Sequence, residues 1–242
     1  MCKVFVTIGI NSLTNEEKEN FQFNVENQDR FFPASVSEVT KGHTKKDIKE
    51  YYHYYPTGQC PTQLKAQIQE YYDNANVLAS ELLSWVELHS PEDVSALYSQ
   101  SLSSMVEQSD KTLLRVLHYP PLEGDEELGA IRAGAHEDIN LLTVLPAANE
   151  PGLHVKTKDG DWLDVPCDFG NLIINIGDML QKASGGYYPS TTHRVINPES
   201  ADKTKFCIYL PLFLHPKPEV VLSDRHTASS YLMERLCELG VI

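Results

Sequence analysis

Three residues of this sequence have the types and the spacing to bind a metal ion together: His136, Asp138 and, far downstream, His193. Two histidines and one carboxylate are the ligand set of a facial-triad iron(II) site, which leaves coordination positions open for other molecules. In an extended strand, alternate side chains share a face, so His136 and Asp138 can point at one ion while Glu137 points away. A fold that brings two distant strands side by side must then add His193.

The segments around these residues predict short β-strands. Apolar runs of strand length occur at residues 139–145 and 171–176, and two further strand candidates at 153–157 and 161–165. The latter two flank Asp159-Gly160, the preferred dipeptide of a tight hairpin. A series of short strands separated by turn signals predicts a mainly β fold, either a sandwich or a jelly roll.

Five segments in this region share their order and spacing with a known family. They are Arg132 to Thr143 (RAGAHEDINLLT), Gly152 to Val155 (GLHV), Asp159 to Trp162 (DGDW), Ile174 to Met179 (INIGDM) and Thr192 to Pro198 (THRVINP). In these segments the chain resembles the isopenicillin N synthase-like branch of the Fe(II)/2-oxoglutarate-dependent dioxygenase superfamily. The resemblance is strong from about Leu113 to the C-terminus and weaker at residues 37–42 and 47–53.

The resemblance implies a fold, a cofactor and a chemistry. The fold would be a double-stranded β-helix, a cupin-like jelly roll, with helices packed on its outside. Iron(II) would be held by His136, Asp138 and His193. The expected activity is an oxidoreductase activity: a dioxygenase that activates O2 with 2-oxoglutarate as cosubstrate and hydroxylates, or otherwise oxidises, a small organic molecule. Desaturation and ring closure are alternative outcomes of the same chemistry.

The sequence departs from the family where the cosubstrate should be held. Family members usually carry an Arg-x-Ser on the strand after the second histidine, whose arginine forms a bidentate pair with the distal carboxylate of 2-oxoglutarate. Counting back from Leu214-His215-Pro216 places Cys207 at the arginine position and Tyr209 at the serine position. A shift of two residues offers Lys205 and Cys207 instead. Lys205 can pair with a carboxylate as a point charge, or it is a solvated edge-strand lysine.

Two residues of an earlier strand are further candidates for contacts with the cosubstrate. Tyr119 matches a family position whose tyrosine contacts a cosubstrate or substrate carboxylate, although a buried structural tyrosine fits equally well. Arg115 points, by strand alternation, to the same face as Leu117 and Tyr119. It would supply a displaced carboxylate contact or take part in a structural ion pair.

Polar residues near the expected ligands are candidates for orienting them. Asn140 and Asn175 lie inside apolar runs and must find partners if they are buried, and Arg194 and Asn197 follow His193 closely. A purely structural role is the alternative for all four.

Three other functions remain open for the same ligand set. The first is an iron(II) oxidase or oxidative cyclase that resembles isopenicillin N synthase and needs no 2-oxoglutarate. The second is a catalytically silent jelly-roll module that keeps the three residues as a structural metal site. The third is a hydrolytic zinc site, which no placed general base supports.

The composition limits the partners and the compartment. The formal net charge is −14, which disfavours nucleic acid and anionic membranes, so we expect a small-molecule substrate and O2 as partners. The cysteines, at positions 2, 60, 167, 207 and 237, are odd in number and form no CxxC pair. With neither an apolar run of membrane-spanning length nor a secretory signal, these features predict a soluble cytoplasmic protein. Nothing in the sequence indicates the oligomeric state.

The chain is expected to form one oxygenase domain, residues 1–242, in three parts. Residues 1–110 should be mostly helical and shorter than in the family, residues 111–222 the jelly-roll core, and residues 223–242 a C-terminal helix. The shortened N-terminal part would leave the site more open, or covered by a partner subunit. Apolar positions recur at mostly three- to five-residue intervals from Thr62 and predict a long helix with one buried face. Thr227 and Gly240 are the expected start and stop signals of the C-terminal helix.

Overall fold

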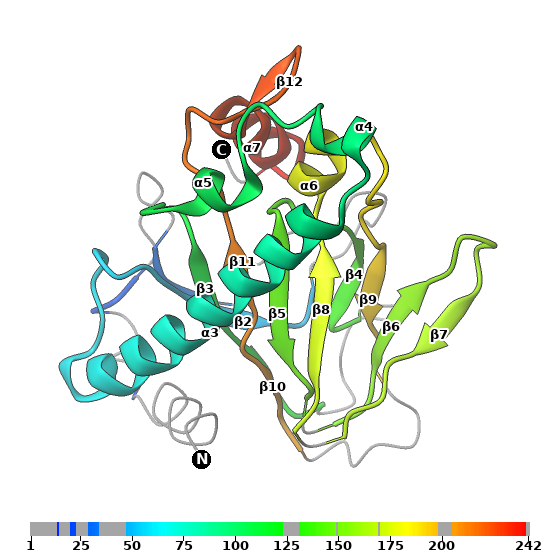
Figure 1. The fold of residues 1–242 in the computed structure, drawn as a ribbon. Helices are drawn as coiled ribbons and strands as arrows, with labels where there is room; N and C mark the ends of the chain where they lie inside the picture. Colours follow the sequence, from blue (N-terminus) through cyan, green and yellow to red (C-terminus); the bar gives the residue numbers. More distant parts are fainter. Residues whose placement is uncertain are drawn as a thin grey trace.

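The chain folds into two antiparallel sheets with helices on the outside (Figure 1). The computed structural model describes residues 14, 20–22, 29–33, 47–122, 131–148, 150–168, 170–197 and 205–240. The weak family match at residues 37–42 and most of the first 46 residues lie outside the described residues. What was expected of them stays a prediction.

The larger sheet has the strand order β1-β2-β3-β11-β5-β8, and β10 also pairs with β3. Its strands are β1 (Arg30–Phe32), β2 (Glu50–Tyr54), β3 (Leu113–Tyr119), β5 (Leu142–Pro146), β8 (Leu172–Ile176), β10 (Cys207–Tyr209) and β11 (Leu212–Leu214). All these pairings are antiparallel, and several neighbouring strands, such as β3 and β11, come from segments far apart in the sequence. Two of the strands precede residue 111, where we expected the core to begin. The β-structure therefore starts earlier than the expected division into parts.

The smaller sheet has the order β4-β9-β6-β7 and contains the predicted hairpin. Its strands are β4 (Ala133–His136), β6 (Leu153–Lys156), β7 (Trp162–Asp164) and β9 (His193–Val195). Gly160 turns the β6–β7 hairpin with a φ of 96°, in the left-handed region that glycine adopts without strain. The two sheets form the jelly roll that the sequence predicts.

The long predicted helix is α3 (Thr62–His89), which crosses the outer face of the larger sheet (Figure 1). Its buried side chains recur every three or four residues: Leu64, Ile68, Tyr72, Ala75, Ala79 and Leu83. This spacing forms one apolar stripe that packs against residues of β3, β5 and β11. In the part of the chain that the structure describes, no helix combines the length and the apolar character that a bilayer crossing requires.

The remaining helices are short and lie near one end of the jelly roll (Figure 1). They are α4 (Glu92–Ser95), α5 (Leu102–Val106), α6 (Asp178–Ala183) and α7 (Ala228–Glu238). The hydroxyl of Thr227 caps α7 by accepting from the Ser230 backbone N–H, as predicted, and Gly240 follows the helix with a φ of 67°. A small hairpin of β12 (Val221–Ser223) and β13 (His226–Thr227) precedes α7.

The core has two parts with different neighbours. The first lies between α3 and the larger sheet. The second joins residues of both sheets, for example Leu117 and Tyr119 on β3 with Leu153 on β6 and Val195 on β9. The second part therefore fills the space between the two sheets.

One predicted strand starts later than expected. The run at residues 139–145 forms β5 only from Leu142, because residues 139–141 bend. The strand that carries His136 also ends at that residue, so Asp138 lies in the turn between β4 and β5 rather than in an extended strand.

Candidate metal centre

The structure brings His136, Asp138 and His193 together at one end of the jelly roll. His136 and His193 are directly opposite each other in the β4–β9 ladder. One ligand atom from each of the three residues lies within 4.8 Å of the others. The closest recorded pair is His193 Nε2 and Asp138 Oδ1, at 3.6 Å. Nitrogen and carboxylate donors at this spacing converge on a point that one metal ion can occupy.

Hydrogen bonds to the backbone orient both imidazoles. His136 Nδ1 donates to the Gly134 carbonyl at 2.7 Å, and His193 Nδ1 donates to the Thr191 carbonyl at 3.0 Å. Since Nδ1 carries the proton in each ring, Nε2 keeps its lone pair for a metal ion. The two rings lie 4.4 Å apart, centroid to centroid.

Asp138 is buried and hydrogen-bonded through the oxygen that does not face His193. Its Oδ2 accepts from Thr143 Oγ1 at 2.7 Å and from Asn175 Nδ2 at 2.8 Å. Burial opposes ionisation, but the imidazoles of His193 and His136 and these two hydrogen bonds together lower the pKa of Asp138. The residue is therefore a charged, fixed carboxylate with Oδ1 directed at the other ligands.

The His136 imidazole is uncharged at physiological pH and can therefore bind a metal ion. Burial, followed by the charge of His193, lowers the pKa of His136 to about 4. A metal ion binds the neutral imidazole, so at physiological pH no proton competes for this ligand atom.

The turn that carries Asp138 is held by the start of α6. The Asp178 N–H donates to the Asp138 carbonyl at 2.7 Å, and the Gly177 N–H donates to the Leu141 carbonyl at 3.1 Å. A Cβ at Gly177 would lie 2.1 Å from the Asn140 carbonyl oxygen, so only glycine allows this approach. Asn140 itself, fully buried, donates to the Leu142 carbonyl and to Thr143 Oγ1. Both asparagines that we expected to have partners have them. Asn140 supports the turn, and Asn175 supports the Asp138 carboxylate.

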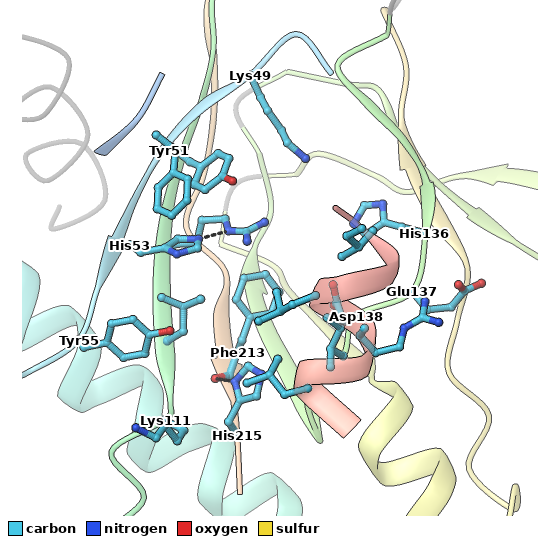
Figure 2. Close-up of a pocket in the computed structure, with 18 of the residues that line it drawn as sticks. Lys49, Tyr51, His53, Tyr55, Lys111, His136, Glu137, Asp138, Phe213 and His215 are labelled. Atoms are coloured by element: carbon cyan, nitrogen blue, oxygen red, sulfur yellow. Dashed lines mark hydrogen bonds between the residues drawn. The ribbon is translucent and has the colours of Figure 1, made fainter. Parts of the chain in front are cut away.

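A cavity of about 190 Å³ opens beside His136 and Asp138 (Figure 2). His136 and Asp138 lie on one wall, and Lys49, Tyr51 and His53 of the β2 segment lie on the opposite wall (Figure 2). Aromatic rings and basic groups from other elements complete the lining: Phe32, Tyr55, Phe213, His215, Lys111, Arg115 and Arg235. Apolar residues of α7, including Leu232 and Leu236, close one side.

The candidates for cosubstrate contacts do not gather in this cavity as a group. Arg115 lines it, donates from Nε to His53 Nε2 at 2.8 Å, and stacks 4.5 Å above the Tyr51 ring. Tyr119, Cys207 and Tyr209 instead lie in the core between the two sheets. Lys205 has a side chain that is 57% exposed and faces Glu150 at 3.8 Å.

Of the other candidates for orienting the ligands, Arg194 lies 4.0 Å above the Trp162 ring and within 3.4 Å of His154 Nδ1. Among the described residues, the side chain of Arg194 contacts Trp162 and His154 rather than its sequence neighbour His193. Arg194 therefore packs against the β6–β7 hairpin rather than against the candidate ligands.

Several residues of the site are not predicted from the sequence. Thr143 was read only as part of an apolar strand, and the cavity wall formed by Lys49, Tyr51 and His53 was not anticipated. A signal existed for the latter, because these three residues alternate along one strand and must share one face. The contribution of α7 had no such signal, since its apolar stripe indicates burial but not the neighbouring surface.

The comparison with known proteins supports this geometry. A candidate oxygenase from Shewanella oneidensis has a crystal structure that matches 100% of this chain and 87% of its own, with 65% sequence identity and a TM-score of 0.87. The family model of the 2OG-Fe(II) oxygenase superfamily matches residues 111–216, which contain all three candidate ligands. The chain belongs to the 2OG-Fe(II) oxygenase superfamily. Iron(II) and 2-oxoglutarate are the cofactor and cosubstrate after which this superfamily is named.

More distant proteins are similar to this chain in sequence or in fold. Gibberellin 2-beta-dioxygenase 2 of Arabidopsis thaliana is 33% identical over 141 residues, which are 57% of this chain and 40% of the plant enzyme. The chain thus matches less than half the length of this curated relative. The full-length Neurospora crassa T7H, solved in complex with alpha-KG, is 21% identical and superposes with a TM-score of 0.78 over 97% of this chain and 80% of its own.

Proposed function

We propose that this protein is an Fe(II)-dependent dioxygenase that uses 2-oxoglutarate and O2 to hydroxylate a small organic molecule. His136, Asp138 and His193 are its iron ligands. The observation that carries the proposal is the convergence of two Nε2 atoms and one fixed carboxylate oxygen beside an open cavity. The donor set fits ferrous iron, since imidazole and carboxylate ligands on one face are typical of non-haem iron oxygenases.

The residues around the metal have different roles. Among the described residues, only three His, Cys, Asp or Glu ligands cluster here, so part of the coordination sphere stays open to a 2-oxoacid and O2. An iron(II) ion held by these residues, together with 2-oxoglutarate and O2 as the oxidant, would supply the oxidising chemistry. The hydrogen bonds from Thr143 and Asn175 keep Asp138 in place while those open positions are used.

The cavity supports a small substrate with aromatic or acidic character. Its volume of about 190 Å³ excludes a macromolecule from the space beside the metal. Aromatic faces from Tyr51 and Phe213 and the Arg115 guanidinium between them suit a flat molecule that carries a negative group. The substrate atom nearest to His136 and Asp138 would then be the one that is oxidised, because the cavity holds that atom closest to the metal.

Within the superfamily we assign the chain to the isopenicillin N synthase-like branch. The order and spacing of the five segments from Arg132 to Pro198 support this assignment. The rival function is an iron(II) oxidase of that branch that needs no 2-oxoglutarate. The cysteine and tyrosine at positions 207 and 209, where the family carries its Arg-x-Ser, distinguish the two functions only weakly, because isopenicillin N synthase keeps this motif for its substrate carboxylate.

The deciding experiment is an anaerobic calorimetric titration of 2-oxoglutarate into the iron(II)-loaded protein. We expect binding that requires iron and disappears in His136→Ala. The matched control is His89→Ala, because His89 is an exposed helix residue remote in sequence from the ligands. Succinate released in step with O2 consumption would then exclude the oxidase. Iron binding without any affinity for 2-oxoglutarate would contradict the proposed function and favour the oxidase.

A further inference from the structure

A buried arginine between the two sheets has no partner that explains its burial. Arg132 immediately precedes β4 and is only 2% exposed, which makes it one of the largest fully buried side chains among the described residues. Its Nε and Nη1 atoms have no hydrogen-bond partner in the described part of the structure. A guanidinium always carries its charge, and a buried charge without a counter-charge is strongly unfavourable.

The nearby acids are already used by other groups. Asp47 accepts from Lys49 Nζ at 2.8 Å and from the Gly134 N–H at 3.1 Å. Glu150 faces Lys205 at 3.8 Å. Among the described residues, no carboxylate lies within ion-pair distance of Arg132. With no counter-charge among the described residues, an external anion would compensate this charge.

Arg132 is buried beside three side chains, Tyr119, Cys207 and Tyr209, and we call these four residues the arginine cluster. The guanidinium lies 5.8 Å from the centre of the Tyr119 ring, and the Tyr119 and Tyr209 rings meet edge to face at 5.5 Å. Cys207 pairs with Tyr119 in the β3–β10 ladder. The Tyr209 hydroxyl, beside the Cys207 thiol, is a second buried polar atom without a hydrogen-bond partner among the described residues.

The arginine cluster joins the two sheets, and Arg132 lies close in sequence to His136. Arg132 leads into β4 of the smaller sheet, whereas β3 and β10 belong to the larger one (Figure 1). Only three residues separate Arg132 from His136, so their Cα atoms are at most about 14 Å apart. Two long side chains reaching from these positions can hold opposite ends of one short diacid.

We propose that Arg132, with the Tyr209 hydroxyl as a second donor, binds the distal carboxylate of 2-oxoglutarate. This inference rests on the proposed function. Position 207, where the family has an arginine, carries an uncharged cysteine. Arg132, which leads into the facing sheet, supplies the positive charge beside the Cys207 side chain. A guanidinium can form two parallel hydrogen bonds with one carboxylate, so Arg132 selects a 2-oxoacid with a second acidic group.

The test compares two ligands that differ only at the distal end. Anaerobic calorimetry on the iron(II)-loaded protein measures the affinities of 2-oxoglutarate and of 2-oxopentanoate, which has a methyl group in place of the distal carboxylate. We expect the wild type to prefer the diacid by about 100-fold. In Arg132→Met, 2-oxoglutarate should bind only as well as 2-oxopentanoate, whose own affinity stays unchanged.

Three further variants make the result specific. Adding Cys207→Arg to Arg132→Met returns an arginine to the family position and should restore at least about 10-fold of the preference. Lys205→Met removes the exposed lysine that was the alternative candidate for the carboxylate contact. This variant should keep the full preference for 2-oxoglutarate over 2-oxopentanoate. Arg132→Lys retains the charge without the fork and should lose about 10-fold. This last variant decides the question if the methionine variant does not fold.

The outcomes separate the two proposals. If the wild type binds 2-oxoglutarate and Arg132→Met keeps the preference for the diacid, the role of Arg132 is wrong and the proposed function stands. If neither acid binds to the iron-loaded wild type, both proposals are overturned. Without ligands, Arg132→Met should melt no lower than the wild type, because it removes a buried charge that has no partner. A much lower melting temperature with an unchanged preference would make Arg132 a structural residue.

Discussion

At the scale of single residues, the site depends on the hydrogen bonds behind the ligands. Thr143 and Asn175 are directly opposite each other in the β5–β8 ladder, and both donate to the same oxygen of Asp138. One cross-strand pair therefore fixes the carboxylate from two directions. The backbone carbonyls of Gly134 and Thr191 do the same for the two imidazoles.

Removing one of these donors should weaken iron binding without removing a ligand. Thr143→Val keeps the side-chain shape and loses the hydrogen bond to Asp138, and we expect the affinity for iron(II) to fall by about 10- to 100-fold. Anaerobic competition with a chromogenic chelator measures the affinity. Thr157→Val, in the exposed β6–β7 hairpin, is the control and should bind iron like the wild type. Equal affinities in both variants would show that Thr143 does not support the metal centre.

At the scale of elements, the metal centre depends on a close approach between a turn and a helix. The turn between β4 and β5 carries Asp138, and its backbone contacts the residues that begin α6. Gly177 has a φ of −99°, an ordinary value, so its role is to leave space rather than to adopt an unusual conformation. The helix start and the ligand turn are therefore one unit.

Filling this space should disturb both stability and metal binding. Gly177→Ala places a methyl group 2.1 Å from the Asn140 carbonyl oxygen, and we expect it to lower the free energy of unfolding by about 3 kcal/mol. Urea denaturation measures this change, and the chelator assay should show weaker iron binding. Gly170→Ala is the matched control, since it meets open space at a φ of 95° and should cost only about 1 kcal/mol, with iron binding intact. Similar losses from both substitutions would rule out the steric explanation.

At the scale of the whole molecule, buried histidines make stability depend on pH. Burial lowers the pKa of His215, which lines the cavity, to about 4. In the unfolded chain a histidine has a pKa of about 6.5, so between these two values the unfolded state binds more protons than the folded state. The stabilisation is complete above about pH 6.5 and is lost as the pH falls toward 4.

Substituting this histidine should flatten the pH profile. Between pH 8 and pH 5, the metal-free wild type should lose about 2 kcal/mol more of its free energy of unfolding than His215→Gln. Urea denaturation at a series of pH values, with a chelator present, measures the difference. Parallel profiles for the two proteins would mean that His215 titrates normally in the folded state.

The cavity is also a property of the whole molecule, because the jelly roll forms most of it and α7 closes it. Leu236→Trp adds a bulky ring to the α7 side. We expect substrate turnover to fall at least about 10-fold, while iron(II) and 2-oxoglutarate affinities stay within about 3-fold of the wild type. Steady-state kinetics and anaerobic calorimetry provide the two measurements. A matching loss of 2-oxoglutarate affinity would place the cosubstrate, rather than the substrate, against α7.

The sequence by itself determined the ligand types, most strands, the long helix α3, the C-terminal helix α7 and the superfamily. These features depend on residue type and short-range periodicity, which act within a few neighbouring residues. The bend that places Asp138 outside its strand, the exposed position of Lys205 and the cavity wall on α7 were decided only by the tertiary structure. So was the burial of Arg132, a residue that the sequence marks merely as part of a motif. Each of these features depends on which distant segment packs beside the residue. A local sequence pattern does not specify that segment.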